Sequence, residues 1–331
     1  MGNSNSKQTK KSSALVVNSD ALLHVRFLWA KSHSLYRRMS HNIAREICLY
    51  VGRLPELLYY YDHVMYRVNP VKQTKELFFV IGSGFTDSIV GVQRAVFIGR
   101  DEVFLLLRDV NHPGEDLACY AMFKEEALCS VSDNRHDKFA CALLYDPIRI
   151  CVYVFGGHGV GDSRSSGSLN KDDSPVVEKF KPSNCSTERL PDMLEPRSAH
   201  AVCWHHLCVY ICGGTHPSIE RFHPQTLTYT KMYELPEMVS DVIAFSYQGS
   251  LYMLSDRTIW KENARNFQKI IIDSMEEPGK WRSAPYSVAV IGDCCCFIYE
   301  RQCKTLNLRT LTETSFFTFP THHLKPLRLA S

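Results

Sequence analysis

The sequence lacks any apolar run of about 20 residues, the length that a membrane-spanning helix requires. A secretory leader is also missing, because the first thirty residues start polar and basic, and Asp20, His24 and Arg26 interrupt their short apolar runs. Neither sign of charge dominates, since 38 basic residues face 35 acidic ones and leave a net charge of +3. This balance gives no reason to expect a nucleic-acid partner. We therefore expect a cytoplasmic protein, and a monomer.

No CxxC pair occurs among the 13 cysteines, which argues against a structural zinc site. Several cysteines lie inside apolar runs, such as Cys208, Cys212 and the triplet 294–296. Without a secretory leader, we interpret them as reduced thiols that act as small core residues.

A catalytic motif is absent as well: no pattern places a nucleophile, an acid–base pair or a metal at converging positions. His205-His206 fits a hairpin turn, and His322-His323 is a second adjacent pair. Neighbouring residues in a strand point to opposite faces, so such pairs rarely share a metal. The glycine-rich run that begins at Gly156 opens no helix, unlike a phosphate-binding loop. We expect no catalytic residue, no metal and no cofactor; an enzyme with a site in a central channel is one alternative.

What the sequence does contain is a repeat. Five apolar strands, such as V-Y-V-F-G and V-Y-I-C-G, recur at intervals of 49, 57, 42 and 45 residues. Each carries an aromatic residue in a similar place, namely Phe104, Tyr153, Tyr210, Tyr252 and Phe297. Each strand follows another apolar run and a tight turn, so each unit begins as a β-hairpin. Weaker repeats after each hairpin add two more strands, and four short strands at this period predict a β-propeller blade.

The repeat resembles the kelch family, whose period is about 50 residues. Gly156-Gly157 and Gly213-Gly214 match the family's double glycine, and residues 196–202 look like its approach to the inner strand. Two pairs of aromatic residues fill the outer positions, namely Phe222 with Tyr229 and Trp260 with Phe267. The resemblance implies an all-β fold, a kelch-type β-propeller of six blades with one incomplete.

The predicted domain boundaries follow from these repeats. Five full units are expected at residues 88–128, 139–190, 197–236, 239–273 and 282–319, and residues 54–80 read as the outer half of another blade. The propeller would thus cover residues 54–319. A tail at 1–19 and a helical segment at 20–53 precede it, and a tail at 320–331 follows.

The N-terminus fits the pattern for N-myristoylation, with Gly2 after the initiator Met and Ser6 at the hydroxyl position. A single myristoyl chain binds membranes only marginally. Lys7, Lys10 and Lys11 supply a second, electrostatic contact, worth about 1 kcal/mol each near an anionic surface. We therefore expect a peripheral protein at the cytosolic face of a membrane.

Residues 20–53 are expected to form two helices, with Ser19 or Asp20 and Ser40 as N-caps and Gly52 as a stop. The first would be basic and would lie either on the membrane or against the propeller. The second resembles the opening of an F-box, which would make the protein a substrate adaptor of a ubiquitin ligase.

An insertion at residues 158–174 lengthens one connection between the second and third strands of a blade. By resemblance, kelch domains commonly bind protein partners on the face that carries these connections. The residues predicted there are Arg108, His158, Arg164, Arg197, His216, Arg257, Arg282 and Arg301. Their basic character favours a partner with an acidic segment. The sequence thus predicts a non-catalytic interaction scaffold.

We predict that Gly2→Ala moves the protein from membrane to soluble fractions, because the variant cannot be acylated. Replacing Lys7, Lys10 and Lys11 by Gln should weaken membrane binding and leave acylation intact, since lipid and charge act separately. Fractionation and mass spectrometry of the N-terminal peptide measure the two effects. An unmodified Gly2 amine in cells that contain the acyltransferase would contradict this prediction.

Overall fold

The computed structural model describes residues 57–61, 64–70, 73–80, 89–98, 102–109, 117–124, 127–130, 140–158, 173–239, 242–255, 258–263, 266–272, 288–291, 293–299 and 302–318. The expected tails at 1–19 and 320–331, and the expected helices within 20–53 with their F-box resemblance, lie outside these ranges. Within the described ranges, no helix is long and apolar enough to cross a membrane.

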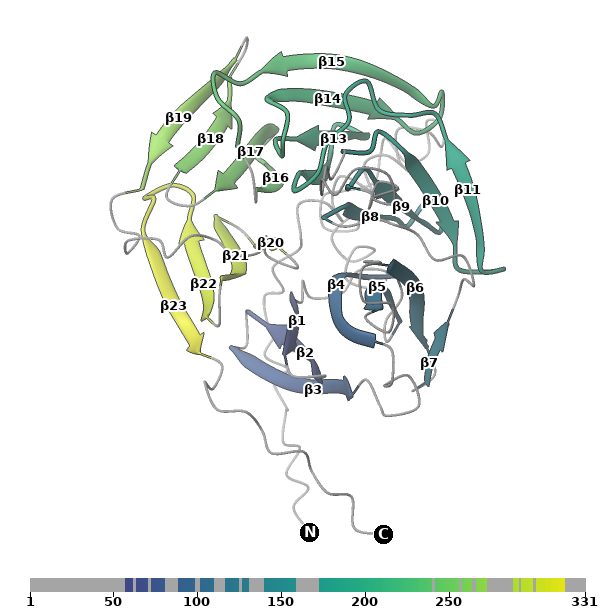
Figure 1. Ribbon diagram of the computed structural model, residues 1–331. Helices are drawn as coiled ribbons and strands as arrows, with labels where there is room; N and C mark the ends of the chain where they lie inside the picture. The colour runs from purple at the N-terminus through teal and green to yellow at the C-terminus, as the bar shows by residue number, and fades with distance from the viewer. Residues whose placement is uncertain are drawn as a thin grey trace, which may run out of the picture.

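The described residues form 23 strands in six antiparallel sheets. The sheets stand around a common centre as the blades of a β-propeller, which confirms the predicted fold class (Figure 1). We number them blade 1 to blade 6 in chain order. Blade 1 has three strands and the other five have four each, so one blade is incomplete among the described residues, as predicted.

The strands follow the chain in order within each blade. Blade 1 holds β1 (Leu57–Tyr61), β2 (Val64–Asn69) and β3 (Thr74–Val80). Blade 2 holds β4 (Ile89–Phe97), β5 (Val103–Asp109), β6 (Leu117–Lys124) and β7 (Ala127–Ser130). Blade 3 holds β8 (Ala142–Asp146), β9 (Cys151–Phe155), β10 (Val177–Lys181) and β11 (Ser186–Leu190).

The remaining blades repeat this order. Blade 4 holds β12 (Ala201–His205), β13 (Cys208–Cys212), β14 (Ser218–His223) and β15 (Thr228–Glu234). Blade 5 holds β16 (Ile243–Tyr247), β17 (Ser250–Ser255), β18 (Thr258–Glu262) and β19 (Phe267–Ile271). Blade 6 holds β20 (Val288–Ile291), β21 (Cys294–Tyr299), β22 (Gln302–Asn307) and β23 (Glu313–Thr318).

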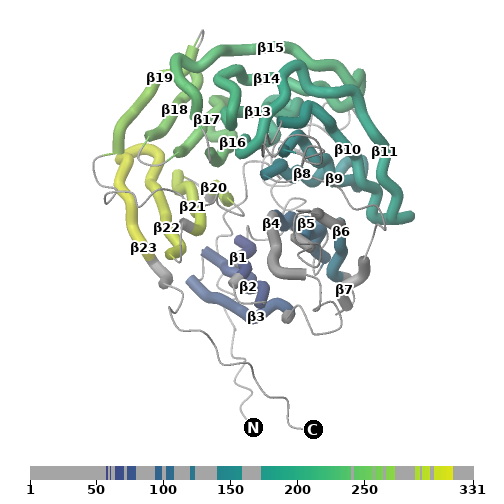
Figure 2. The backbone as a smooth tube through the Cα atoms, viewed as in Figure 1, coloured from purple at the N-terminus to yellow at the C-terminus, as the bar shows by residue number. Residues whose placement is uncertain are grey.

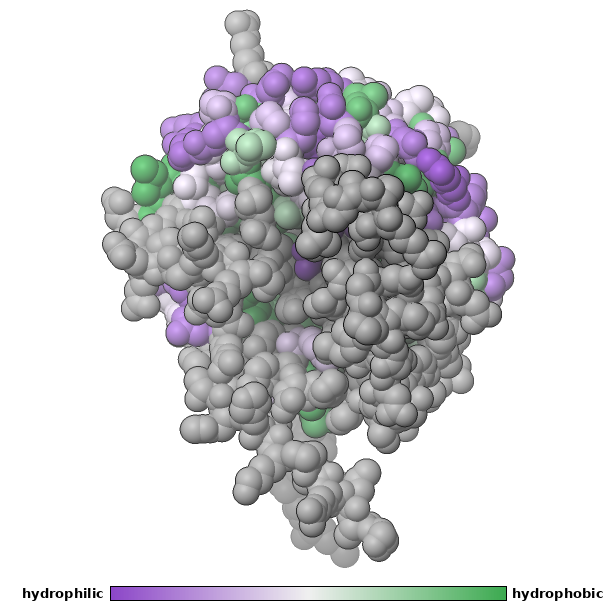
Figure 3. All heavy atoms as spheres, viewed as in Figure 1, coloured by the Kyte–Doolittle hydropathy of each residue, from purple (hydrophilic) through white to green (hydrophobic). Residues whose placement is uncertain are grey.

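In the five full blades the first strand lies toward the centre and the fourth forms the rim (Figure 1). The second strands of blades 3 and 4 are buried throughout, at all five residues of β9 and of β13, and so is β16, the first strand of blade 5. The fourth strands expose polar residues, and hydrophilic residues gather over the rim at β11 and β15 (Figure 3). A strand apolar on both sides needs a neighbour on each face, which explains why the blades pack side by side.

Six apolar clusters fill the six interfaces between neighbouring blades. One of them joins blade 6 to blade 1 through Cys296 and Ile298 on one side and Leu57 and Val68 on the other. The first and last blades therefore pack against each other and close the ring (Figure 2).

The five repeated aromatic residues all lie on second strands, as the sequence predicts. Four of them face the following blade, namely Phe104, Tyr153, Tyr210 and Tyr252. Phe297 differs, because it packs toward blade 5, and its neighbour Cys296 takes the forward direction. The prediction of equivalent places is therefore wrong for Phe297 by one residue, and one residue along a strand reverses the face.

Polar bonds add to the apolar contacts between blades. They include Tyr120 Oη to Glu178 Oε2 at 2.5 Å, Trp204 Nε1 to the Tyr145 carbonyl at 3.0 Å, His205 Nδ1 with Ser246 Oγ at 2.9 Å, and Tyr247 Oη to Asp293 Oδ1 at 2.5 Å. These four contacts join blades 2 to 3, 3 to 4, 4 to 5 and 5 to 6 in turn.

The described cysteines are free thiols, and most are buried in the blade interfaces. Burial raises the pKa of Cys212 and of Cys303 to about 12, so both thiols stay protonated near neutral pH. This agrees with their interpretation as small core residues.

We predict that Tyr210→Ala lowers the free energy of unfolding by about 3–5 kcal/mol, because truncation leaves a cavity in a packed interface. The Tyr210 side chain is only 5% exposed and lies between blades 4 and 5. Tyr233→Ala, on the rim strand of the same blade, is the matched control and should cost less. Urea denaturation measures both changes, and equal losses would contradict the buried position of Tyr210.

Candidate functional site

One face of the propeller carries two kinds of connection: those between second and third strands, and those that lead from a rim strand into the next blade. We call it the loop face. Its best-described part is formed by residues 156–158, 173–176, 191–200, 213–217 and 235–239 around blades 3 and 4. The hairpin turns at residues 147–150, 206–207 and 248–249 lie on the opposite face, which we call the turn face.

The double glycines fix the connections of the loop face. Gly156 and Gly213 have φ values of +55° and +64°, where a side chain is strained. A Cβ on Gly156 would lie 2.5 Å from the Arg197 carbonyl oxygen, and one on Gly213 would meet the carbonyl oxygen of Val239. The following N–H group donates to the same carbonyl in each case, Gly157 to Arg197 at 2.9 Å and Gly214 to Val239 at 2.7 Å. Each double glycine thus holds the connection into the next blade against the end of a second strand.

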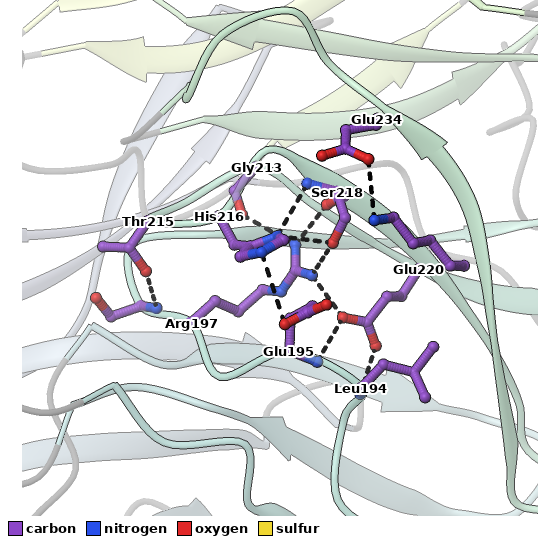
Figure 4. A network of polar contacts seen from close by, with 11 residues as sticks. Leu194, Glu195, Arg197, Gly213, Thr215, His216, Ser218, Glu220 and Glu234 are labelled. Atoms are coloured by element: carbon purple, nitrogen blue, oxygen red, sulfur yellow. Dashed lines mark hydrogen bonds and ion pairs between the residues drawn. The ribbon is translucent and has the colours of Figure 1, made fainter.

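The Glu220 carboxylate binds backbone N–H groups of the connection at residues 191–200. It is fully buried on β14 and accepts the N–H groups of Leu194, at 2.9 Å on Oε2, and of Glu195, at 3.1 Å on Oε1. Oε1 also accepts Nη2 of Arg197 at 2.5 Å (Figure 4). A carboxylate with this many donors is well compensated for its burial.

The prediction that Arg197 lies on the partner surface is wrong. The sequence places it on an exposed binding face, but its side chain is fully buried. Besides Glu220, its guanidinium donates to the Ser218 carbonyl at 2.6 Å, to Ser218 Oγ at 2.7 Å and to the Gly213 carbonyl at 3.3 Å. Arg197 therefore builds the connection and cannot contact a partner.

His216 lies closer to the surface, 30% exposed, beside this pair. Its Nδ1 accepts the Ser218 N–H at 3.2 Å, which places the ring proton on Nε2. Nε2 faces the Glu195 carboxylate at 3.6 Å (Figure 4). His216 is thus on the loop face as predicted, but an acidic residue stands next to it.

The two ends of the insertion lie side by side, because His158 and Asp173 form an isolated antiparallel bridge. The Asp173 carboxylate accepts the Thr215 hydroxyl, and Thr215 Oγ1 accepts the Ser198 N–H at 3.2 Å. These bonds join the described ends of the insertion, at residues 156–158 and 173–176, to the connections at 191–200 and 213–217. We call this joined surface the platform.

His200 is a buried histidine that the sequence reasoning missed. Its side chain lies at the start of β12, and neither ring nitrogen has a hydrogen-bond partner in the structure. Burial, with the positive charges of Arg197 and Arg94, lowers the pKa of His200 to about 3. The ring is therefore neutral near pH 7, and nothing in its spacing within the sequence distinguishes it from an exposed loop histidine.

The other predicted site residues are not placed. Gly2, Lys7, Lys10, Lys11, Arg164, Arg257, Arg282 and Arg301 lie outside the described residues, as does the side chain of Arg108 near the end of β5. His205-His206 ends β12 and begins its hairpin turn, as predicted. In the parts of the chain that the structure describes, no three His, Cys, Asp or Glu side chains gather in a way that could hold a metal ion.

The chain is thus a six-bladed β-propeller with a platform on its loop face. Comparison with protein-family models and with curated proteins gives no match.

We predict that Arg197→Met costs about 3–5 kcal/mol of stability, because it leaves the Glu220 carboxylate buried without its cation. Adding Glu220→Gln should recover part of this loss, since the double variant has no buried charge at this position. A double-mutant cycle from urea denaturation measures the coupling. Strictly additive losses would contradict a direct ion pair.

We also predict acid sensitivity from His200. Because its folded pKa of about 3 is below the ordinary value of 6.5, its stabilising contribution is complete above pH 6.5 and declines as the pH falls toward 3. The slope is at most about 1.4 kcal/mol per pH unit for one proton. In this window the free energy of unfolding of the wild type should fall relative to that of His200→Leu as the pH decreases, and a difference that does not change with pH would contradict the buried neutral ring.

Proposed function

We propose that this protein is a non-catalytic interaction scaffold of the kelch type, which binds a protein partner on the platform and is tethered to a membrane by its N-terminus. The observation that carries the proposal is the set of bonds from Asp173 to Thr215 to Ser198, which ties connections from two blades together. Binding surfaces are commonly built from loops on a rigid scaffold. The glycine contacts with Arg197 and Val239 supply that rigidity.

Exposed apolar side chains on and beside the platform support the proposal of a protein partner. Leu194 is 51% exposed and Met238 is 68% exposed, on the connections that lead into blades 4 and 5. Methionine is enriched at protein interfaces, where large apolar side chains are buried by the partner. These connections lead into β12 and β16, whose residues pack toward both neighbouring blades, so the two side chains project from a fixed base.

The charge of the partner is a separate part of the proposal. The described connections carry the acidic residues Asp192, Glu195 and Glu237, of which Glu195 faces His216. The attraction of an acidic segment therefore depends on the arginines of the other connections, with Arg164 in the insertion as the first to examine.

The test is proximity labelling from the full-length protein with its native N-terminus. One variant replaces residues 159–172 by Asn-Gly, a two-residue turn that can join His158 to Asp173 because these two already pair. A second variant carries Leu194→Ser and Met238→Ser. The matched control is Leu207→Ser, which alters an exposed leucine on the turn face.

We expect both platform variants to lose a common set of labelled proteins that Leu207→Ser retains. Shortening the insertion should change stability by about 1 kcal/mol or less, because loop-closure entropy depends weakly on length. Gly2→Ala should redistribute the labelled proteins away from membranes. An identical set of labelled proteins for all variants would refute the scaffold proposal, and a large loss of stability would show that the insertion belongs to the blade.

A further inference from the structure

The incomplete blade 1 can be aligned strand by strand with the full blades. The pairing of β2 with β3 shifts between Met65 and Tyr66, the second and third residues of β2. The third strands of blades 4 and 6 shift at the same place, between Ile219 and Glu220 of β14 and between Cys303 and Lys304 of β22. This bulge identifies β2 as a third strand.

The packing directions agree with this assignment. The second residue of each of these strands faces the following blade, as Met65, Ile219 and Cys303 show. The fifth residue faces the preceding blade, as Val68, Phe222 and Leu306 show. With β2 as the third strand, β1 is a second strand and β3 is the rim strand. The strand that the described part of blade 1 does not supply is thus the innermost one.

The sequence immediately before β1 has the character of an inner strand. Residues 46–53 read E-I-C-L-Y-V-G-R, and residues 93–100, which contain the end of β4 and its turn, read Q-R-A-V-F-I-G-R. The first has five apolar residues and the second has four, and in both Gly-Arg follows. In this alignment Val51 corresponds to Ile98. Five residues separate Val51 from Leu57 at the start of β1, one more than the four that separate Ile98 from Val103 at the start of β5. The chain length therefore suits an antiparallel hairpin.

We propose that residues 46–51 form the innermost strand of blade 1 and pair with β1, so that the chain completes its own ring. This replaces the second helix that the sequence analysis expects between Ser40 and Gly52. It also removes the F-box-like helix, because a strand pairs along its whole length and cannot offer a helical face. The inference does not depend on the proposed function.

The direction of the strand follows from its pairing. β1 is a second strand and runs from the turn face to the loop face, as β9 and β13 do. An antiparallel partner runs the other way, so Glu46 lies at the loop face. The N-terminal tail with Gly2 would then leave the propeller on the same side as the platform.

Amide hydrogen exchange on the full-length protein tests the proposal at single-residue resolution. An innermost strand has a neighbour on one edge only, so alternate amides of residues 46–51 should exchange more slowly than in a free peptide, by about 100-fold or more. Uninterrupted protection of consecutive amides would indicate a helix and would overturn the proposal. Exchange at the free-peptide rate across the segment would overturn it as well.

A pair of proline variants provides a second measurement. Leu49→Pro and Tyr50→Pro, made separately, each place a residue without an N–H group in the proposed strand. Because only alternate N–H groups of an innermost strand are paired, one of the two variants should lower the melting temperature by about 5 °C or more. Leu22→Pro, in the segment ahead of it, is the matched control and should leave the melting temperature unchanged. Equal melting temperatures for the wild type and for both of these variants would contradict the pairing, and the exchange data on the wild type decide the case if neither variant folds.

Discussion

The fold depends on one constraint: each blade has two apolar faces, and each face must be covered by a neighbour. The five buried residues of β13 show this most clearly, since Val209 and Ile211 pack toward blade 3 and Tyr210 packs toward blade 5. A sheet of this kind is not stable alone, because both of its apolar faces would be exposed to water. A ring satisfies all the blades at once, and the cluster that joins Leu57 and Val68 to blade 6 completes it. Because the ring closes through blade 1, the packing of blade 1 affects the stability of the whole protein.

The same constraint explains why the loop face can hold a binding surface. The double glycines follow second strands that are packed on both faces. They allow the Arg197 and Val239 carbonyls to approach within hydrogen-bond distance. The Glu220 carboxylate then fixes the connection at residues 191–200 from within blade 4. In this part of the propeller, buried charged side chains therefore have a structural role. The exposed large apolar side chains on the described connections are Leu194 and Met238.

Much of the fold could be predicted because the repeat is periodic. The spacing of the aromatic residues locates the second strand of every full blade, and the hairpins before them locate the first. The blade toward which a side chain points is harder to predict, as Phe297 shows. A shift of one residue along a strand moves a side chain to the opposite face. The outer aromatic pairs show the same limit. Phe222 stands opposite Tyr229, whereas Trp260 stands opposite Lys269, although both pairs are seven residues apart in the sequence.

By itself, the sequence determined the class of fold, the order of the strands and the positions of the two double glycines, because these depend on local periodicity and on backbone conformation. Only the tertiary structure decided which polar residues are buried. Arg197 and Glu220 are 23 residues apart, and Asp173 and Thr215 are 42 apart, so neither contact follows from local spacing. A basic residue in a loop looks the same in sequence whether it meets solvent or a buried carboxylate. The burial of a charge is set by the partner that the fold brings to it.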